Sequence, residues 1–340
     1  MHRMYTVSAS TLRQVISRAL FPIVSLMLIG ACCIIPISQA VSSFSEDFEE
    51  KVIEGDGPGK ILVIPVNGVI TDQDTANFFG PSEESTVASV TSQLNRARKD
   101  DSLSAVILKV NSPGGGVTAS DIIYREILEF KKAKNIPVVA VFMDMAASGG
   151  YYISMAADRV YAHPTSITGS IGVIFGLVNV KEGLDKIGIK DYSITSGDNK
   201  SIGSPTREMT EQQQKILQSI VDDLYQRFVT IVKAGRPDLS REQILKLADG
   251  RVYSANQAKS NGLVDDVGYF DEFVKATTSL PNYKGPKGVE KPKIVIYTRS
   301  SRELDNIYQA STAESPDLNR IIKQLVFPGS SARFYFLWTP

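Results

Sequence analysis

Between residues 61 and 157, short runs of consecutive apolar residues alternate with longer stretches whose apolar positions recur every three or four residues. Three apolar runs have the length of buried strands: residues 61–66, 105–110 and 137–143. Three amphipathic stretches predict helices: residues 85–99, 119–134 and 148–157. Buried strands that alternate with helices are typical of a parallel sheet with crossover helices, so the pattern predicts an α/β fold.

Further elements follow along the chain. The pattern predicts helices over residues 211–233, 241–247 and 255–261 and one more strand over residues 294–297. We therefore place the main domain at residues 60–280 and a looser carboxyl-terminal extension at residues 281–340. The extension ends in an aromatic cluster at residues 334–338. Apolar clusters of this kind are usually covered, so we expect it to pack on another surface, with a neighbouring subunit as one candidate.

The amino-terminal part reads as a membrane anchor. Residues 19–45 contain no charged side chain, and an apolar stretch of about 20 residues spans a bilayer as a helix. Only basic charges precede this stretch and acidic ones follow it, which predicts a cytoplasmic tail at residues 1–18 and export of the rest. We expect a transmembrane helix over residues 19–41, a linker over residues 42–59, and a catalytic part outside the cytoplasmic membrane of a bacterium.

Two other interpretations of this segment stay open. In the first, it is a cleaved secretory signal, with residues 38–40 as a weak cleavage site. In the second, residues 29–32 form a lipoprotein box, and Cys32 is acylated after cleavage. All three interpretations agree that the chain is exported.

Composition excludes several kinds of function. The 37 basic and 37 acidic residues leave no net charge, which argues against a nucleic-acid binder. The two cysteines are adjacent, at positions 32 and 33, and by themselves cannot build a disulfide framework or supply four zinc ligands. Two histidines leave little for a His-based triad or a His-rich metal site. Gly59 and Lys60 lack the earlier glycine and the following Ser or Thr of a phosphate loop, so we expect no bound nucleotide. We also expect no metal and no other cofactor.

Two glycine-rich turns follow two successive predicted strands, at residues 111–116 and 145–151. Ligands of parallel sheets bind at the carboxyl ends of the strands, so both turns are expected to open on the same edge. The second turn carries Ser148, whose simplest role is to cap the following helix. The glycines of the first turn could present amide groups to an oxyanion. Together the two turns favour Ser148 as a nucleophile.

A serine nucleophile needs a base. His163 is the only histidine of the exported part and stands at the end of a short apolar run. A buried lysine can take the same role, because desolvation disfavours its charged form. Lys200 stands alone among small and polar residues at positions 195–205. On composition alone Lys200 is one lysine among many, and both candidates stay open at this point.

Taken together, these stretches resemble the signal peptide peptidase A family, also called protease IV, in its short single-anchor form. The resemblance rests on several motifs in order, which lie at residues 61–68, 111–116, 145–152, 168–173, 200, 204–210 and 250–253. It implies the fold of the Clp proteolytic subunit and the crotonases, in which ββα units stack into a superhelix.

The resemblance also implies roles for single residues. Ser148 corresponds to the nucleophile and Lys200 to the general base. Ser170 corresponds to a serine that orients the lysine. The amides of Gly115 and of Ser148 itself correspond to the oxyanion hole.

As a whole, the resemblance implies a serine endopeptidase that degrades cleaved signal peptides and other short apolar peptides at the membrane. It implies a homo-oligomer, typically an octamer, in which neighbouring subunits supply the serine and the lysine. Two alternatives remain: a crotonase-type acyl-CoA enzyme, which would use a glutamate base, and a non-catalytic membrane scaffold of the same fold.

Overall fold

The computed structural model describes residues 48–74, 84–299, 306–309 and 334–338. The chain divides into two compact units, residues 1–48 and 49–340, and the described residues belong to the second apart from Phe48. The predicted cytoplasmic tail and anchor therefore lie outside the described residues. Within the described ranges, no helix combines the length and the apolar character that crossing a membrane requires.

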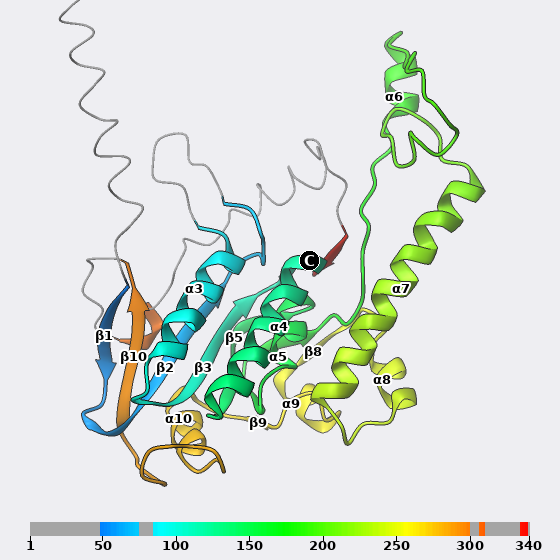
Figure 1. The fold of residues 1–340 in the computed structure, drawn as a ribbon. Helices are drawn as coiled ribbons and strands as arrows, with labels where there is room; N and C mark the ends of the chain where they lie inside the picture. The colour runs from blue at the N-terminus through cyan, green and yellow to red at the C-terminus, as the bar shows by residue number, and fades with distance from the viewer. Residues whose placement is uncertain (1–47, 75–83, 300–305, 310–333, 339–340) are drawn as a thin grey trace, which may run out of the picture. The chain divides into compact units, whose positions relative to one another are not determined.

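A nine-stranded sheet forms the centre of this unit (Figure 1). Its strands are β1 (Glu49–Glu54), β2 (Gly57–Asn67), β3 (Leu103–Ser112), β5 (Val138–Ala147), β6 (Arg159–Ala162), β7 (Ile167–Gly169), β8 (Val252–Ser254), β9 (Asp266–Val267) and β10 (Pro292–Thr298). The order is β1-β10-β2-β3-β5-β6-β9, and β7 pairs with β5 and β8. All neighbours from β10 to β9 are parallel, which confirms the predicted α/β sheet.

Helices cover both faces of the sheet, which explains why its central strands are apolar without alternation. The helices α3 (Thr86–Lys99), α4 (Val117–Lys134) and α5 (Gly149–Ser154) pack together over one face. On the other face, Ile107 of β3 belongs to a buried cluster with Phe273 of α10 (Phe270–Thr278). Side chains three residues apart on β3 point to opposite faces, so Val110 lies towards α5, where it approaches Gly150.

Three more helices confirm the sequence pattern: α7 (Glu211–Gly235), α8 (Arg241–Leu247) and α9 (Ala255–Ser260). Each begins with a capping box, in which a Ser or Thr side chain and a Gln three residues later bond each other's backbone amides. The segment between β7 and α7 holds α6 (Lys181–Lys186), which the pattern did not predict.

Both segments that flank the predicted main domain contribute strands to the sheet. Residues 49–59 of the expected linker form β1 and the start of β2, and β10, from the expected extension, lies between these two strands. The acidic, glycine-rich composition of this stretch hid β1, because an edge strand leaves half of its side chains in solvent. The peptidase unit thus needs both of its flanks to complete the sheet.

Candidate active site

Ser148 stands between the end of β5 and the start of α5 in a backbone conformation that L-residues rarely adopt, with φ 53° and ψ −112°. Its side chain makes no capping hydrogen bond to α5, and the residue is only 1% exposed. A strained backbone of this kind costs about 1–3 kcal/mol and is concentrated at functional sites. The cap, which was the simplest role for this serine, is therefore excluded.

The two glycine-rich turns meet, as the sequence led us to expect. A Cβ placed on Gly149 would lie 3.0 Å from the amide nitrogen of Gly115 and 3.1 Å from the Cα of Gly114. Residues Gly114–Gly116 form the short strand β4, which approaches the start of α5 directly. Only glycine allows two backbones to come this close, because any side chain would fill the gap.

Ser170 also lies at this edge. It follows β7, whose Gly169 pairs with Ala147 at the end of β5. The Ser148 amide donates to the Gly169 carbonyl at 2.8 Å, so the two serines stand at the ends of adjacent parallel strands. Ser170 is 7% exposed and has a φ of 49°, a positive value like that of Ser148. The structure thus brings Ser148, Ser170 and Gly115 together.

One part of the expected oxyanion hole is wrong. Because the Ser148 amide is bonded to Gly169, it is not available to a substrate oxygen. The next amide, that of Gly149, is the better candidate. Its nitrogen would lie 2.7 Å from a Cβ built on Gly114, on the side where the two turns meet. The first amides of a helix have no partner within the helix, and this rule could have identified Gly149 from the sequence.

An extended strand from the carboxyl-terminal part of the same chain lies beside the start of α5, next to Ser148. This strand, β11 (Tyr335–Leu337), pairs antiparallel with β4. On its other side Tyr335 exchanges two backbone hydrogen bonds of 3.0 Å with Ile174. The aromatic cluster expected to pack on another surface therefore packs on its own chain, between two backbone edges.

The register between β11 and β4 places the Phe336 carbonyl at the glycine-rich turn of residues 111–116. Hydrogen bonds join the Val117 amide to the Phe334 carbonyl (3.2 Å) and the Trp338 amide to the Pro113 carbonyl (2.9 Å). Bonded pairs alternate along an antiparallel ladder, so the intervening pair, Phe336 and Gly115, is also a bonded one. A Cβ on Gly114 would lie 2.0 Å from the Phe336 carbonyl oxygen. This carbonyl thus lies between the two candidate oxyanion amides.

Lys200 is not part of this group. It is exposed and follows α6, in the segment that leads to α7. The Gln213 side chain at the start of α7 donates to the Asp198 carbonyl at 2.7 Å, which ties the Lys200 loop to that end of the helix. Phe228 of α7 packs on Tyr152 of α5. It lies 15 residues after Gln213, which corresponds to roughly 22 Å along the helix at a rise of 1.5 Å per residue. Within one chain, Lys200 therefore cannot reach Ser148.

Two other potential bases lie elsewhere. The Nδ1 of His163 is 2.8 Å from Thr165 Oγ1, and the ring rests edge-on against Tyr269. Burial lowers the pKa of Lys109 on β3 to about 8, but Lys109 Nζ bonds the Ile307 carbonyl at 2.6 Å. Lys109 shares the α10 face of the sheet with Ile107, opposite α5. Neither residue therefore serves Ser148 in this arrangement.

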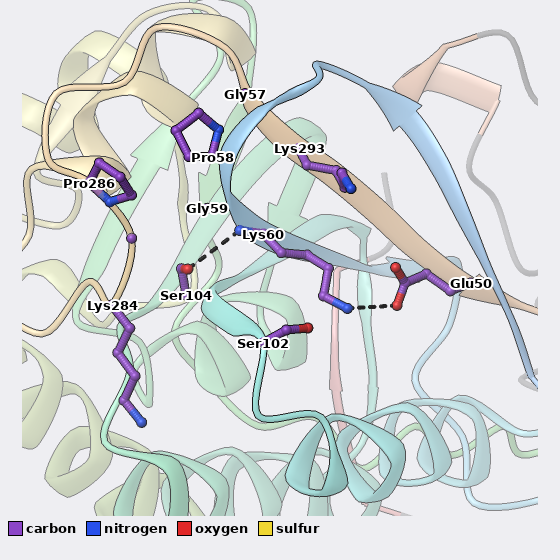
Figure 2. A pocket seen from close by; sticks show the side chains of 11 residues that line it. Glu50, Gly57, Pro58, Gly59, Lys60, Ser102, Ser104, Lys284, Pro286 and Lys293 are labelled. Atoms are coloured by element: carbon purple, nitrogen blue, oxygen red, sulfur yellow. Dashed lines mark hydrogen bonds and ion pairs between the residues drawn. The ribbon is translucent and has the colours of Figure 1, made fainter.

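A cavity of about 440 Å³ lies at the opposite ends of the parallel strands (Figure 2). It is lined by the starts of β2, β3 and β10, whereas Ser148 and Gly115 follow the carboxyl ends of their strands. Lys60, which Figure 2 shows turned towards Glu50, bonds that carboxylate at 2.8 Å and Asp100 at 2.7 Å, and both raise its pKa. Lys60 is therefore held in its charged form. Among the described residues, no cluster of His, Cys, Asp and Glu could hold a metal ion.

Comparisons with known proteins identify the family. Residues 130–284 match the family described as Peptidase family S49, and residues 65–168 match Clp protease. The chain is 40% identical over 261 residues to "Putative signal peptide peptidase SppA" of Enterococcus faecium, covering 77% of this chain and 73% of that one. It is 39% identical over 231 residues to "Protease 4" of Salmonella typhi, covering 67% and 36%.

Two further proteins are similar to this chain. A protease of Methanocaldococcus jannaschii is 35% identical over 79% of this chain and 83% of its own length, and its name is likewise qualified as putative. The structure of a ClpP1 mutant from Listeria monocytogenes covers 63% of this chain and 94% of its own at 19% identity and a TM-score of 0.41. The identity to the first relative, over most of both chains, shows the family. The chain belongs to peptidase family S49 and is a serine peptidase.

Proposed function

We propose that this chain is a membrane-anchored endopeptidase that uses a serine–lysine dyad, Ser148 as nucleophile and Lys200 as general base. The observation that carries the proposal is β11, an extended backbone held beside Ser148 by β4 on one side and Ile174 on the other. A peptide substrate in the same place would be held by main-chain hydrogen bonds, as in strand addition. Such binding suits short peptides without a fold of their own.

The chemistry follows from these groups. Neutral Lys200 removes the proton of the Ser148 hydroxyl, whose oxygen attacks the peptide carbonyl. The Gly115 and Gly149 amides stabilise the oxyanion of the tetrahedral intermediate, and one such donor is worth about 3 kcal/mol in other hydrolases. The lysine gives its proton to the leaving amine, and water then hydrolyses the acyl-enzyme with the lysine again as base. Ser170 orients the lysine.

Because Lys200 is far from Ser148 in one chain, the proposal requires a second copy to supply it. The segment that carries Lys200 exposes several apolar side chains, including Ile187 (69%), Tyr192 (82%) and Ile194 (99%). Exposed apolar groups in such number mark an interaction surface. A homo-oligomer, with the octamer as the form that the resemblance implies, would cover this surface and deliver Lys200 to the neighbour's Ser148.

For the substrate, we propose cleaved signal peptides and other short apolar peptides left at the extracytoplasmic face of the cytoplasmic membrane. The apolar stretch at residues 19–41 supports the membrane location. The similarity to the Enterococcus relative, which is named a putative signal peptide peptidase, supports the substrate. Mass spectrometry of the protein extracted from membranes would test the anchor: the intact chain is expected. A chain that begins after residue 40, or an acylated Cys32, would contradict it.

Hydrolysis of short fluorogenic peptides tests the catalytic proposal. Ser148→Ala and Lys200→Ala are each expected to lower kcat by at least about a thousandfold. Lys246→Ala is the control, because Lys246 is an exposed lysine of α8, outside the segment that carries Lys200, and it should retain the wild-type rate. Activity of Ser148→Ala near that of the wild type would end the nucleophile assignment.

A further inference from the structure

The loop that carries Lys200 has little apolar support of its own. It runs from Asp191, which follows α6, to Arg207, which precedes α7. Every residue from 192 to 200 is exposed to solvent, so burial of apolar side chains does not fix the shape of this half of the loop. Within one chain, polar contacts must therefore set the conformation that presents Lys200.

The carboxylate of Asp191 joins the two ends of this loop. Its Oδ1 accepts hydrogen bonds from the backbone amide of Ser193, at 2.7 Å, and from the Ser193 hydroxyl. Its Oδ2 accepts from the Thr206 hydroxyl at 2.7 Å and from Arg207 Nε at 2.9 Å. A single carboxylate thus holds Ser193 and Thr206, which are 13 positions apart in the sequence.

Arg207 closes the same contact from the other end. Its guanidinium also donates to the Ser193 carbonyl, and its own carbonyl accepts from the Asn179 side chain at 2.9 Å. The bonds from Ser193, Thr206 and Arg207 hold the pKa of Asp191 well below its usual range, so its carboxylate stays ionised. Isolated surface ion pairs contribute little, but a carboxylate that accepts four hydrogen bonds, one of them from a guanidinium, is a stronger tie.

Lys200 lies near the middle of the loop closed in this way. Its amide donates to the Gly197 carbonyl at 3.1 Å, and the Gln213 side chain of α7 donates to the Asp198 carbonyl at 2.7 Å. The loop is therefore held at its base by Asp191 and near Lys200 by α7. A general base must come within hydrogen-bond distance of the proton it removes, and a misplacement of about 1 Å can lower the rate by about a hundredfold.

We propose that Asp191 and Arg207 are positioning residues for the general base: their contact closes the loop of residues 191–207 and sets the place from which Lys200 projects. This inference rests on the proposed function and adds two residues that act through Lys200 and not on the substrate. If the two residues only stabilised their own subunit, their loss would affect the folded protein as a whole and not the delivery of the lysine.

Kinetics of single variants of the full-length protein give the first test. Asp191→Asn turns one acceptor oxygen into a donor, which cannot pair with all of the donors now present. We expect kcat for a fluorogenic peptide to fall by at least about tenfold while KM stays within about twofold, because the binding edge at β4 is unchanged. Arg207→Ala should behave alike. Arg207→Lys keeps the charge without the planar group of donors, so its kcat should lie between those of Arg207→Ala and the wild type.

Asp158→Asn is the matched control for a loss of stability. Asp158 also bonds a cation and a backbone amide, those of Lys131 and Val138, each at 2.8 Å. It lies before β6, at the strand ends opposite to Ser148. This variant should lower Tm and leave the kcat of the folded protein unchanged. An Asp191→Asn variant with the kcat of the wild type would overturn the positioning role.

Mixed oligomers separate the positioning of Lys200 from a general effect. When Ser148→Ala copies are combined with Lys200→Ala copies, the first supply the lysine and the second supply the serine. Asp191→Asn added to the lysine-supplying copies should lower the restored activity by at least about tenfold, whereas on the serine-supplying copies it should leave the activity within about twofold. Equal losses from both placements would assign Asp191 to folding or assembly and overturn the inference.

The outcomes also separate this inference from the function on which it rests. Loss of activity in Lys200→Ala beside full activity in Asp191→Asn overturns the positioning role and leaves the dyad in place. Full activity of Lys200→Ala overturns the dyad and the inference with it. If the mixed oligomers restore no activity, the single variants and their control still decide whether Asp191 acts on kcat.

Discussion

Phe336 of β11 and Gly115 of β4 form a backbone pair directly beside Ser148. In the proposed function a substrate strand would pair with β4, whose backbone donors and acceptors on this edge are already taken by β11. A peptide can bind only after β11 leaves. Under the proposed function, the protein's own carboxyl-terminal strand would therefore compete with its substrates.

Weakening β11 should raise the activity. We expect Phe336→Ala to lower KM for short peptides several-fold, because it removes the ring contacts with Tyr152 and Phe228 that hold β11 in place. Tyr308→Ala, a change at a 64% exposed aromatic residue elsewhere in the carboxyl-terminal part, should have no such effect. If Phe336 only stabilises the core, its variant will instead show a lower Tm together with a lower kcat/KM.

The glycines of β4 differ in what they tolerate. Gly114 has a φ of 104°. A Cβ added to it would lie 2.0 Å from the Phe336 carbonyl oxygen of β11 and 2.7 Å from the Gly149 amide nitrogen. Gly114→Ala should therefore abolish peptide cleavage, since a substrate carbonyl would meet the same methyl group. In Gly116→Ala the nearest atom is the Ala119 Cβ at 3.6 Å, an ordinary contact, and activity should be retained. Equal kinetics of the two variants would contradict the assigned binding edge.

Asp100 gives the fold a dependence on pH. Burial alone would raise the pKa of Asp100, but bonds from Lys60, Ser102 and Tyr297 outweigh it and hold the pKa well below the usual 3.8. A folded-state pKa below the unfolded one adds stability above about pH 4 that is lost as the pH falls. Asp100→Asn should cost about 2 kcal/mol in urea unfolding at pH 7 and progressively less below about pH 4.

Asp101→Asn is the matched control for this effect. Asp101 bonds Lys134 at 2.9 Å, but its side chain is fully exposed, and such pairs contribute little. The two variants should therefore differ clearly at pH 7. An equal, small effect of both would show that the bonds to Asp100 do not stabilise the folded state.

The sequence predicted the elements whose periodicity is strong, and it missed those that depend on distant partners. The apolar runs that became β2, β3 and β5 needed no partner to be recognised. By contrast, β1 and β11 are short and have polar or irregular neighbours, and they form only because β10 and β4 lie beside them. Ser148 and Gly115 could be placed on one edge from their positions after consecutive strands, and the structure confirms that they meet.

The rest of the site could not be derived from local patterns. Nothing near Phe228 in the sequence indicates that its ring meets that of Tyr152, 76 positions earlier. The role of Lys200 came from the family resemblance, and in one chain its loop is tied to the start of α7, roughly 22 Å along that helix from Phe228. The dyad therefore stays a prediction about an assembly of several copies.

Mixing two inactive variants tests this central claim most directly. Ser148→Ala lacks the nucleophile but keeps Lys200, and Lys200→Ala lacks the base but keeps Ser148. If the dyad forms between copies, co-assembly of the two variants in one membrane extract should restore part of the wild-type peptidase activity. Random mixing pairs intact Ser148 with intact Lys200 in about a quarter of the contacts, so about a quarter of the wild-type rate is the expected ceiling. Activity that stays at the level of the separate variants, in mixed oligomers verified by mass spectrometry, would contradict a dyad shared between subunits.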